Sequence, residues 1–284
     1  MISTMEKFIN FKQLNVVKTG TSTANGSAAL TLTDSAALFT QSILPNAIVW
    51  DRTTNAGTGG EMYTVASVDS DTQLTLVAIG ATASRGGGVP DATAYFIYMP
   101  ENTVKQGGTA DGTGAYQLID TGVNFVTAGV QIGDSAYDIT GGATALVTAV
   151  GVTTLTLNTD IFVGGDVYMV YSKVADDHNS LMRSADLGFI ENTGTNNLNS
   201  ELKITYGDKS ASQILLTYAF TSSTGSDEDM RNGVQNAVVA SLQTPWPNVA
   251  FDFPGVLNKE VTAGNVNDGA LAGQNFFILR FQKV

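Results

Sequence analysis

The stretch that decides the fold is Leu118–Leu157, with the sequence LIDTGVNFVTAGVQIGDSAYDITGGATALVTAVGVTTLTL. Apolar residues alternate with small polar residues in short runs, and glycines separate one run from the next. This pattern is typical of half-buried β-strands joined by tight turns. No catalytic or cofactor motif lies in the stretch. It therefore predicts a small antiparallel β-barrel or β-sandwich module.

An earlier copy of the same pattern begins near Leu32. Trp50-Asp51 matches Tyr137-Asp138 at an offset of 87 residues, and the first copy carries an additional insertion at Ala81–Pro90. Insertions of this kind cost little when they fall in loops. The other matches are Asn15–Lys18 with Asn102–Lys105, Leu32–Ser35 with Leu118–Thr121, Phe39 with Phe125, Thr64–Val68 with Leu146–Val150, Leu74–Leu76 with Leu155–Leu157, and Tyr95–Tyr98 with Val167–Val170. The sequence thus predicts two tandem modules, residues 1–100 with an N-terminal arm and residues 101–172.

Residues 173–284 follow a different pattern. Lys173–Ser184 is polar and predicts a linker or a strap over a neighbour. Ser226 as N-cap, three acidic residues after it and Pro245 at the end predict one helix. Its apolar face is expected to contain Met230, Val234, Ala237, Val238 and Leu242. Strands are expected at Leu187–Ile190, Glu201–Tyr206, Ser212–Phe220, Val249–Phe253 and Phe276–Val284. The fold class is therefore mainly β, with two β-modules followed by a small α+β domain, an antiparallel sheet with one helix.

The charge balance limits the partners that we expect. Only 14% of the 284 residues are charged, and the net charge is −12. Nucleic-acid binding depends on Lys and Arg that release phosphate counterions, and an anionic membrane surface repels an acidic protein. We therefore expect no nucleic acid and no membrane among the partners.

The cysteine count and the N-terminal segment limit the compartment. The absence of cysteine excludes disulfides and thiolate metal sites. The segment MISTMEKFINFKQL lacks the basic start and the apolar core of a signal peptide, and no apolar run is long enough to span a bilayer. We therefore expect synthesis in the cytoplasm.

Few residues are candidates for catalysis or metal binding. His178 is the only histidine, and no nucleophile or second nitrogen or sulfur ligand accompanies it. The acidic groups at 69–71, 176–177 and 227–229 raise the alternative of a structural calcium ion. Their spacing is not that of an EF-hand, and a hairpin turn or a helix N-terminus explains the first and the third.

The glycine clusters are candidates for phosphate binding. They lie at 57–60, 86–88 and 107–114. A P-loop needs Lys-Ser/Thr after the glycines, and a dinucleotide-binding turn needs a helix after it. Neither follows these clusters, so we predict turns there. We predict no catalytic residue, no cofactor, no metal and no enzymatic activity.

Aromatic residues are the main candidates for contact with a partner. Trp246 lies between two prolines, which suits either an interface anchor or a ring that packs the helix end onto the sheet. The strand Tyr95–Tyr98 suits a sugar-binding platform on one face only, because alternation places half of its side chains in the core. The expected interface residues are Phe8, Phe11, Trp50, Tyr95, Tyr98, Arg183 and Trp246.

The pattern DTGVNF…AGVQIGD…ALVTAV…TLTL…DIF in residues 120–162 resembles a β-module of virion proteins of tailed bacteriophages, marine and cyanobacterial phages in particular. Lys203–Asp208 and the helix up to Pro245-Trp246 also resemble segments of such proteins. The first copy departs from the pattern, since Pro45–Ala47 replaces the turn at Gly133-Asp134.

The resemblance implies a non-enzymatic virion protein, made in the host cytoplasm, that decorates or cements the capsid shell. Its implied partners are the major capsid protein or other virion proteins and further copies of itself. The alternatives are a tail, collar or fibre component and a carbohydrate-binding adhesin. A hydrolase is disfavoured because the usual acid, base and nucleophile combinations are missing.

Overall fold

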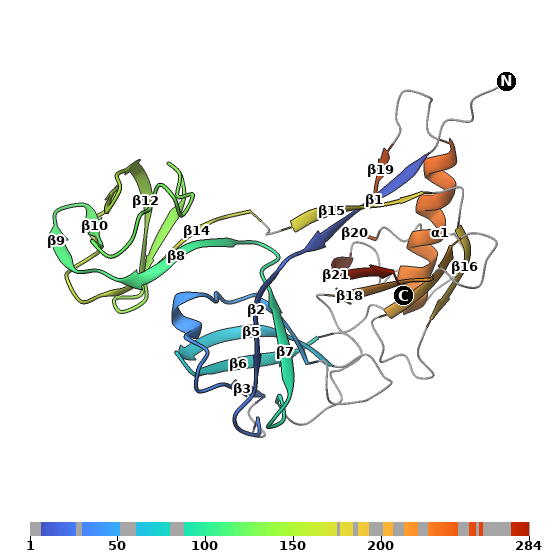
Figure 1. Cartoon of the computed structure of the whole chain (residues 1–284), viewed down its shortest axis with the longest axis horizontal. Helices are drawn as coiled ribbons and strands as arrows, with labels where there is room; N and C mark the ends of the chain where they lie inside the picture. The colour runs from blue at the N-terminus through green and yellow to red at the C-terminus, as the bar shows by residue number, and fades with distance from the viewer. Residues whose placement is uncertain are drawn as a thin grey trace.

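The structure is a computed structural model and describes residues 7–26, 30–51, 61–79, 88–174, 177–183, 187–192, 201–206, 213–220, 227–243, 250–253, 256–257 and 274–283. Most of the described residues lie in strands, and the described residues contain one α-helix, which confirms the mainly β fold class. The described strands form three sheets, and Figure 1 shows them as separate lobes that meet near the centre of the molecule.

Module 1 is an antiparallel sheet of six strands in the order β2-β7-β4-β5-β6-β3. The strands are β2 (Val16–Thr21), β3 (Thr31–Thr33), β4 (Ile48–Asp51), β5 (Glu61–Ser70), β6 (Gln73–Ala78) and β7 (Ala94–Tyr98). The expected hairpin of β5 and β6 is confirmed. A turn at residues 45–46 replaces the first half of the strand expected at 43–50, and a 3-10 helix, η1 (Phe39–Gln41), precedes it. Asn46 has a φ of 69° in that turn, a value that strand residues do not adopt.

Module 2 repeats the strand order of module 1. Its sheet runs β8-β14-β11-β12-β13-β10-β9, in which the first six strands correspond in position to β2, β7, β4, β5, β6 and β3. The strands are β8 (Thr103–Thr109), β9 (Gly112–Gly114), β10 (Gln117–Ile119), β11 (Ser135–Asp138), β12 (Ala143–Val150), β13 (Thr154–Leu157) and β14 (Val167–Ser172). The same strand order with the same antiparallel pairing is what two copies of one module should have.

Strand pairing corrects the alignment of the two copies at one strand. Asp51 lies opposite Tyr95 in module 1, and Asp138 lies opposite Tyr168 in module 2. Tyr95 therefore corresponds to Tyr168, not to Val167 as the sequence pattern predicted. Both strands are rich in apolar residues, so hydrophobicity alone did not fix the match to a single residue.

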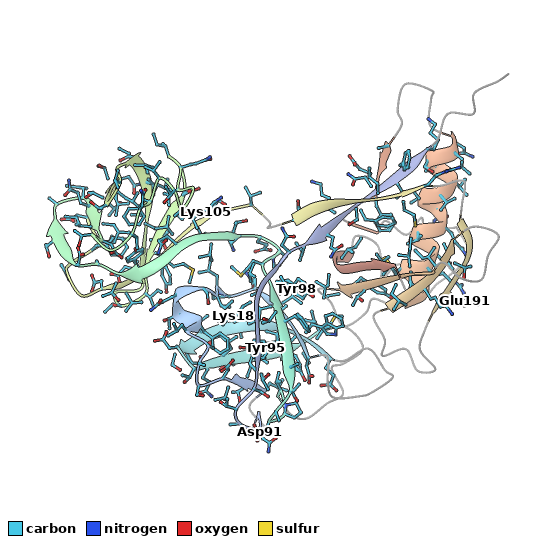
Figure 2. All side chains as sticks on the ribbon, in the orientation of Figure 1. Lys18, Asp91, Tyr95, Tyr98, Lys105 and Glu191 are labelled. Atoms are coloured by element: carbon cyan, nitrogen blue, oxygen red, sulfur yellow. The ribbon has the colours of Figure 1, made fainter. Side chains whose placement is uncertain are left out.

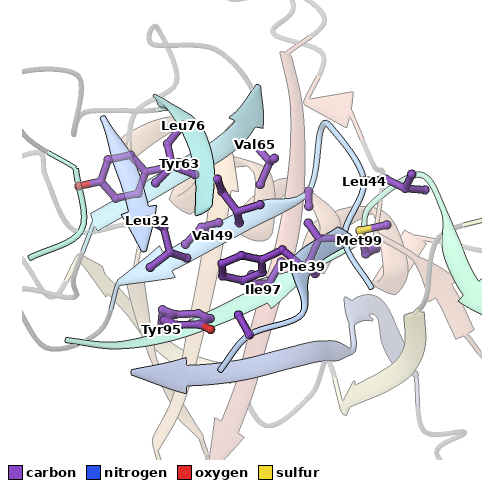
Figure 3. Close-up of a cluster of buried hydrophobic side chains, with 14 of the residues drawn as sticks. Leu32, Phe39, Leu44, Val49, Tyr63, Val65, Leu76, Tyr95, Ile97 and Met99 are labelled. Carbon is purple, nitrogen blue, oxygen red and sulfur yellow. The ribbon is translucent and has the colours of Figure 1, made fainter. Parts of the chain in front are cut away.

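The core of module 1 draws side chains from all six strands of its sheet. Figure 3 shows this cluster, with Leu32, Val49, Tyr63 and Tyr95 facing one another and Leu44 with Met99 at one end. Buried apolar area of this kind is the main favourable term in folding.

The C-terminal sheet has the order β15-β1-β21-β18-β17-β16, with β19 beside β1 and β20 beside β21. Its strands are β1 (Phe8–Leu14), β15 (Asp177–Arg183), β16 (Leu187–Asn192), β17 (Glu201–Tyr206), β18 (Gln213–Phe220), β19 (Ala250–Asp252), β20 (Val256–Leu257) and β21 (Gln274–Lys283). The pairing is antiparallel except that β1 runs parallel to β19 and β21.

The first strand belongs to this C-terminal sheet and not to module 1. All seven residues of β1 pair with β15, from Phe8 opposite Arg183 to Leu14 opposite Asp177. Figure 1 shows β1 beside β15 and continuing into β2 of module 1. For Phe8–Val17 the sequence suggests an opening strand or an extended arm, and the structure shows strands there. In the segment expected as a linker or strap, Asp177–Arg183 forms β15. Each segment is a strand because the other one satisfies its backbone hydrogen bonds.

The expected helix is α1 (Asp227–Gln243). Met230, Val234 and Ala237 are buried in the core of the C-terminal domain, as predicted. Leu242 is 56% exposed, whereas Ser241 is buried and donates a hydrogen bond to the carbonyl of Val238 at 2.8 Å. The apolar face thus ends one turn earlier than the sequence indicated. Within the described residues, no helix has the length and apolarity needed to cross a membrane.

Candidate interaction surface

A buried aspartate links the end of β3 to β7 in module 1. The Tyr95 hydroxyl donates a hydrogen bond to Asp34 Oδ2 at 2.6 Å, and the Ala36 N–H donates to Asp34 Oδ1 at 2.9 Å. Gly20 faces this pair, and a Cβ atom there would lie 2.6 Å from Asp34 Oδ2. The carboxylate is therefore satisfied on both oxygens, as a buried acid requires.

Module 2 contains the same arrangement. The Tyr168 hydroxyl donates to Asp120 Oδ2 at 2.8 Å, and the Gly122 N–H donates to Asp120 Oδ1 at 2.9 Å. Gly108 lies opposite Tyr168, where a Cβ atom would be 2.8 Å from Asp120 Oδ2. We call each set an Asp–Tyr–Gly cluster. Because its groups are buried and bonded to each other, the cluster is a structural element of the module rather than a site for a ligand.

The two clusters predict that the protein loses stability in alkaline solution. Burial, and then the hydrogen bonds and charges of Asp34 and Asp120, raise the pKa of Tyr95 and Tyr168 far above the ordinary value. Above pH about 10 an exposed tyrosine loses its proton, so the folded protein there binds more protons than the unfolded chain. The free energy of unfolding should therefore fall as the pH rises above about 10.

Urea denaturation at a series of pH values measures this slope, and the absorbance of tyrosinate follows the ionisation. The double variant Tyr95→Phe/Tyr168→Phe should be less stable at neutral pH, by about 1–3 kcal/mol for each carboxylate left without its donor, and should show a smaller alkaline slope. Tyr116→Phe, at an exposed position, should change neither quantity. An unchanged slope in the double variant would show that other groups cause the alkaline loss.

Module 2 is joined to module 1 through the outer face of its sheet. Met169 of β14 is buried in the core of module 1, and Tyr137 and Tyr171 pack against that core. Gly107 of β8 lies on the backbone of Gln41, where a Cβ atom would be 2.9 Å from the carbonyl carbon. The glycines at 107 and 108 thus lie in a strand and allow close approach, whereas the sequence predicted a turn there.

Module 1 is joined to the C-terminal sheet through the corresponding face. Trp50 and Tyr98 lie in a buried cluster with Ala219 of β18 and Leu279 of β21. The rings of Trp50 and Phe96 are 5.7 Å apart. Strand pairing matches Trp50 and Phe96 to Tyr137 and Met169 of module 2. Both modules therefore bury the same outer face against the neighbouring part of the chain.

The structure relocates most of the expected interface residues. Phe11 and Tyr95 are fully buried in the cores of the C-terminal domain and of module 1, and Trp50 and Tyr98 are buried in the junction between these two parts. Figure 2 labels Tyr95 and Tyr98 inside module 1. None of these four side chains offers surface to another molecule, which corrects the prediction for them. Their apolar rings stabilise the chain itself.

Phe8 and Arg183 are half-buried and directly opposite each other in β1 and β15. Trp246 lies outside the described residues. The structure therefore brings two of the expected residues together at one place on the C-terminal sheet, at the β1–β15 edge, and separates them from the aromatic residues of module 1.

The acidic residues of the 69–71 turn make hydrogen bonds within the chain. Asp69 accepts hydrogen bonds from the hydroxyls of Ser67 and Thr75 at 2.6 and 2.7 Å, and Asp71 accepts one from Thr40. The described part of the chain contains no group of three or more His, Asp or Glu residues that could hold a metal ion. His178 lies in β15 opposite Gln13. Asp176 and the glycines at 57–60 lie outside the described residues.

Module 2 has few charges on its surface. Glu101 is exposed just before β8, and Lys105 in β8 is half-buried. From Gln106 to Ser172 the charged residues are Asp111, Asp120, Asp134, Asp138, Asp160 and Asp166. All but Asp111 and Asp160 are buried. Hydrogen bonds from the hydroxyl and backbone N–H of Thr121 lower the pKa of Asp111. The Asp111 carboxylate therefore stabilises the local loop.

The surface of module 2 exposes several large apolar side chains. Ile132 is 72% exposed, more than any other described large apolar residue. The other exposed large apolar residues of module 2 are Tyr116, Val126, Leu146, Val152 and Val163. Sequence analysis missed this surface, although the absence of Lys, Arg and Glu from 106–172 is a signal that the sequence contains. An uncharged surface with exposed apolar residues is typical of one that another molecule covers.

Comparisons with known proteins do not identify a family for this chain. No protein-family model and no curated protein match the chain. Among solved structures, the "Phage phi92 endosialidase" is similar at 12% sequence identity, over 77% of this chain and 39% of the endosialidase chain, with a TM-score of 0.17. This chain thus spans less than half the length of that protein, and a likeness of this size carries no argument about activity.

Proposed function

We propose that this chain is a non-enzymatic structural protein of a tailed-bacteriophage particle, where it decorates or cements the capsid shell. The observation that carries the proposal is the surface of module 2 from Gln106 to Ser172, with its exposed apolar residues and only two exposed charges, Asp111 and Asp160. Proteins that remain free in solution keep charged residues on their surface. A module that lacks them is suited to permanent contact with a neighbour.

The resemblance of residues 120–162 to modules of phage virion proteins supports the proposal that the chain belongs to a bacteriophage particle. The partners would be the major capsid protein or other virion proteins, bound through apolar and uncharged polar surface. The three sheets support the same role, because buried junctions hold both modules against the rest of the chain. A rigid chain loses less conformational entropy when it binds a shell.

The described aromatic residues proposed for the adhesin alternative do not support it. A sugar platform needs exposed aromatic rings, but Trp50, Tyr95 and Tyr98 are buried. These three residues stabilise the core and a junction instead.

Copy number in purified mature particles tests the proposal. Quantitative mass spectrometry should find tens to hundreds of copies per particle, because the symmetry of a shell repeats each contact many times. A count near about six or twelve would match a ring at one vertex and favour a tail or collar component. Absence from the particles would overturn the virion assignment altogether.

A further inference from the structure

Four exposed apolar residues of module 2 lie around one turn. The Phe125 N–H donates to the Val152 carbonyl at 2.8 Å, so Val126 and Val152 are close together. The Gly133 N–H donates to the Val147 carbonyl at 2.9 Å, which places Ile132 close to Leu146. The Val130 N–H donates to the Phe125 carbonyl at 3.1 Å and links the two pairs. We call Val126, Ile132, Leu146 and Val152 the turn surface.

The segment of module 1 that corresponds to this turn makes contacts with another module. Phe39 N–H donates to the Asp71 carbonyl at 2.9 Å, as Phe125 N–H does to Val152, so η1 corresponds to the turn that begins at Phe125. In module 1 this segment is an interface, since η1 contacts β8 and β14 of module 2. In module 2 the corresponding segment contacts no further module among the described residues.

The residues at the two segments differ in polarity. In module 1, Thr40 donates a hydrogen bond to Asp71. The corresponding residues of module 2 are Val126 and Val152, both more than half exposed. A hydrogen-bonded polar pair is thus replaced by two exposed valines. Exposed valine side chains do not stabilise the isolated chain, whereas burying them would.

We propose that two copies of this chain associate through their turn surfaces, module 2 against module 2. The sheet faces that join modules within the chain are already buried, so a second copy offers its own turn surface. No charged residue occurs from Thr121 to Gly133 or from Ile139 to Thr159. A two-fold contact places each residue near its own copy, so a charge there would repel itself. For a chain of net charge −12, this uncharged surface lets two copies meet without bringing charged side chains of like sign together.

Sedimentation velocity of the purified full chain over a range of concentrations tests the association. The wild-type protein should show a dimer that dissociates on dilution. Val126→Asp should raise the dissociation constant at least about 100-fold, because two-fold symmetry places the new carboxylate in the contact twice. Val77→Asp is the matched control. Val77 is 51% exposed on β6 of module 1, against 55% for Val126, and this change should leave the dimer intact.

The double variant Val126→Thr/Val152→Asp separates loss of association from loss of folding. It places in module 2 the polar pair that module 1 accommodates at the same positions, so its thermal unfolding should match that of the wild type while it sediments as a monomer. A wild-type monomer at all concentrations would overturn the proposal. So would a dimer that persists in both turn-surface variants, or one that Val77→Asp disrupts equally. Since association needs no other virion component, none of these results bears on copy number in the particle.

Discussion

Phe11→Ala is expected to lower the free energy of unfolding of the C-terminal domain by about 3–5 kcal/mol. The Phe11 side chain is fully buried in the core under α1, and its ring centroid lies 4.8 Å from that of Phe253. β1 pairs with β15 along one edge and with β19 and β21 along the other. A cavity at Phe11 therefore weakens the strand that joins β15 to β19 and β21.

Hydrogen exchange and urea denaturation measure the effect of Phe11→Ala. Amide protection should fall first in β15, β18 and β21, while the strands of module 2 should keep their protection. Lys12→Ala is the control, because Lys12 is the next residue of the same strand and is exposed. A loss below about 1 kcal/mol for Phe11→Ala would mean that β1 is not a central strand in solution.

The sequence could predict the modules because their strands are local. Alternation in Ala143–Val150 and Thr154–Leu157 is read within a few residues, and a tight turn needs only the residues beside it. The helix was predictable for the same reason, since an N-cap and apolar spacing are local signals. The structure confirms these elements.

The position of β1 could not be predicted in the same way. Its pairing partners are at Asp177–Arg183, Ala250–Asp252 and Ile278, and nothing within β1 specifies a partner so distant in sequence. β1 and β2 are separated only by Asn15. This closeness in sequence led to the prediction that both strands belong to module 1. The burial of Ile9 and Phe11 under the helix decides the sheet to which β1 belongs, and that contact is tertiary.

The interface residues could not be predicted because large aromatic rings suit a core and an interface equally. Trp50 illustrates this, since it is buried in a junction between two parts of one chain. The turn surface consists of aliphatic residues, which sequence analysis assigned to the strands and turns of the module. What distinguishes the turn surface is the absence of charged side chains. This absence can be recognised only in the folded structure, which shows that the aspartates nearby in sequence are buried.

Repetition explains why the chain has one open end. Module 1 buries its outer face on the C-terminal sheet, and module 2 buries the corresponding face on module 1. A series of this kind leaves the segment that would receive a next module uncovered on the last one. The exposed valines at 126 and 152 lie at that segment, whereas module 1 has a polar pair there. Among the described residues, this segment of module 2 is thus uncovered and more apolar than its counterpart in module 1.

Gly107→Val is expected to open the junction between the two modules. A Cβ atom at 107 would lie 2.9 Å from the carbonyl carbon and 3.0 Å from the Cα of Gln41. These are backbone atoms of η1, so β8 or η1 has to move, and overpacking of this kind costs about 1–3 kcal/mol. Small-angle X-ray scattering should show a larger radius of gyration, and amide exchange should increase at Phe39–Gln41 and around Met169. Gly164→Ala is the control, since its Cβ would meet Thr113 Oγ1 at 3.5 Å, an ordinary contact. Unchanged scattering and exchange in Gly107→Val would mean that module 2 does not rest on η1 in solution.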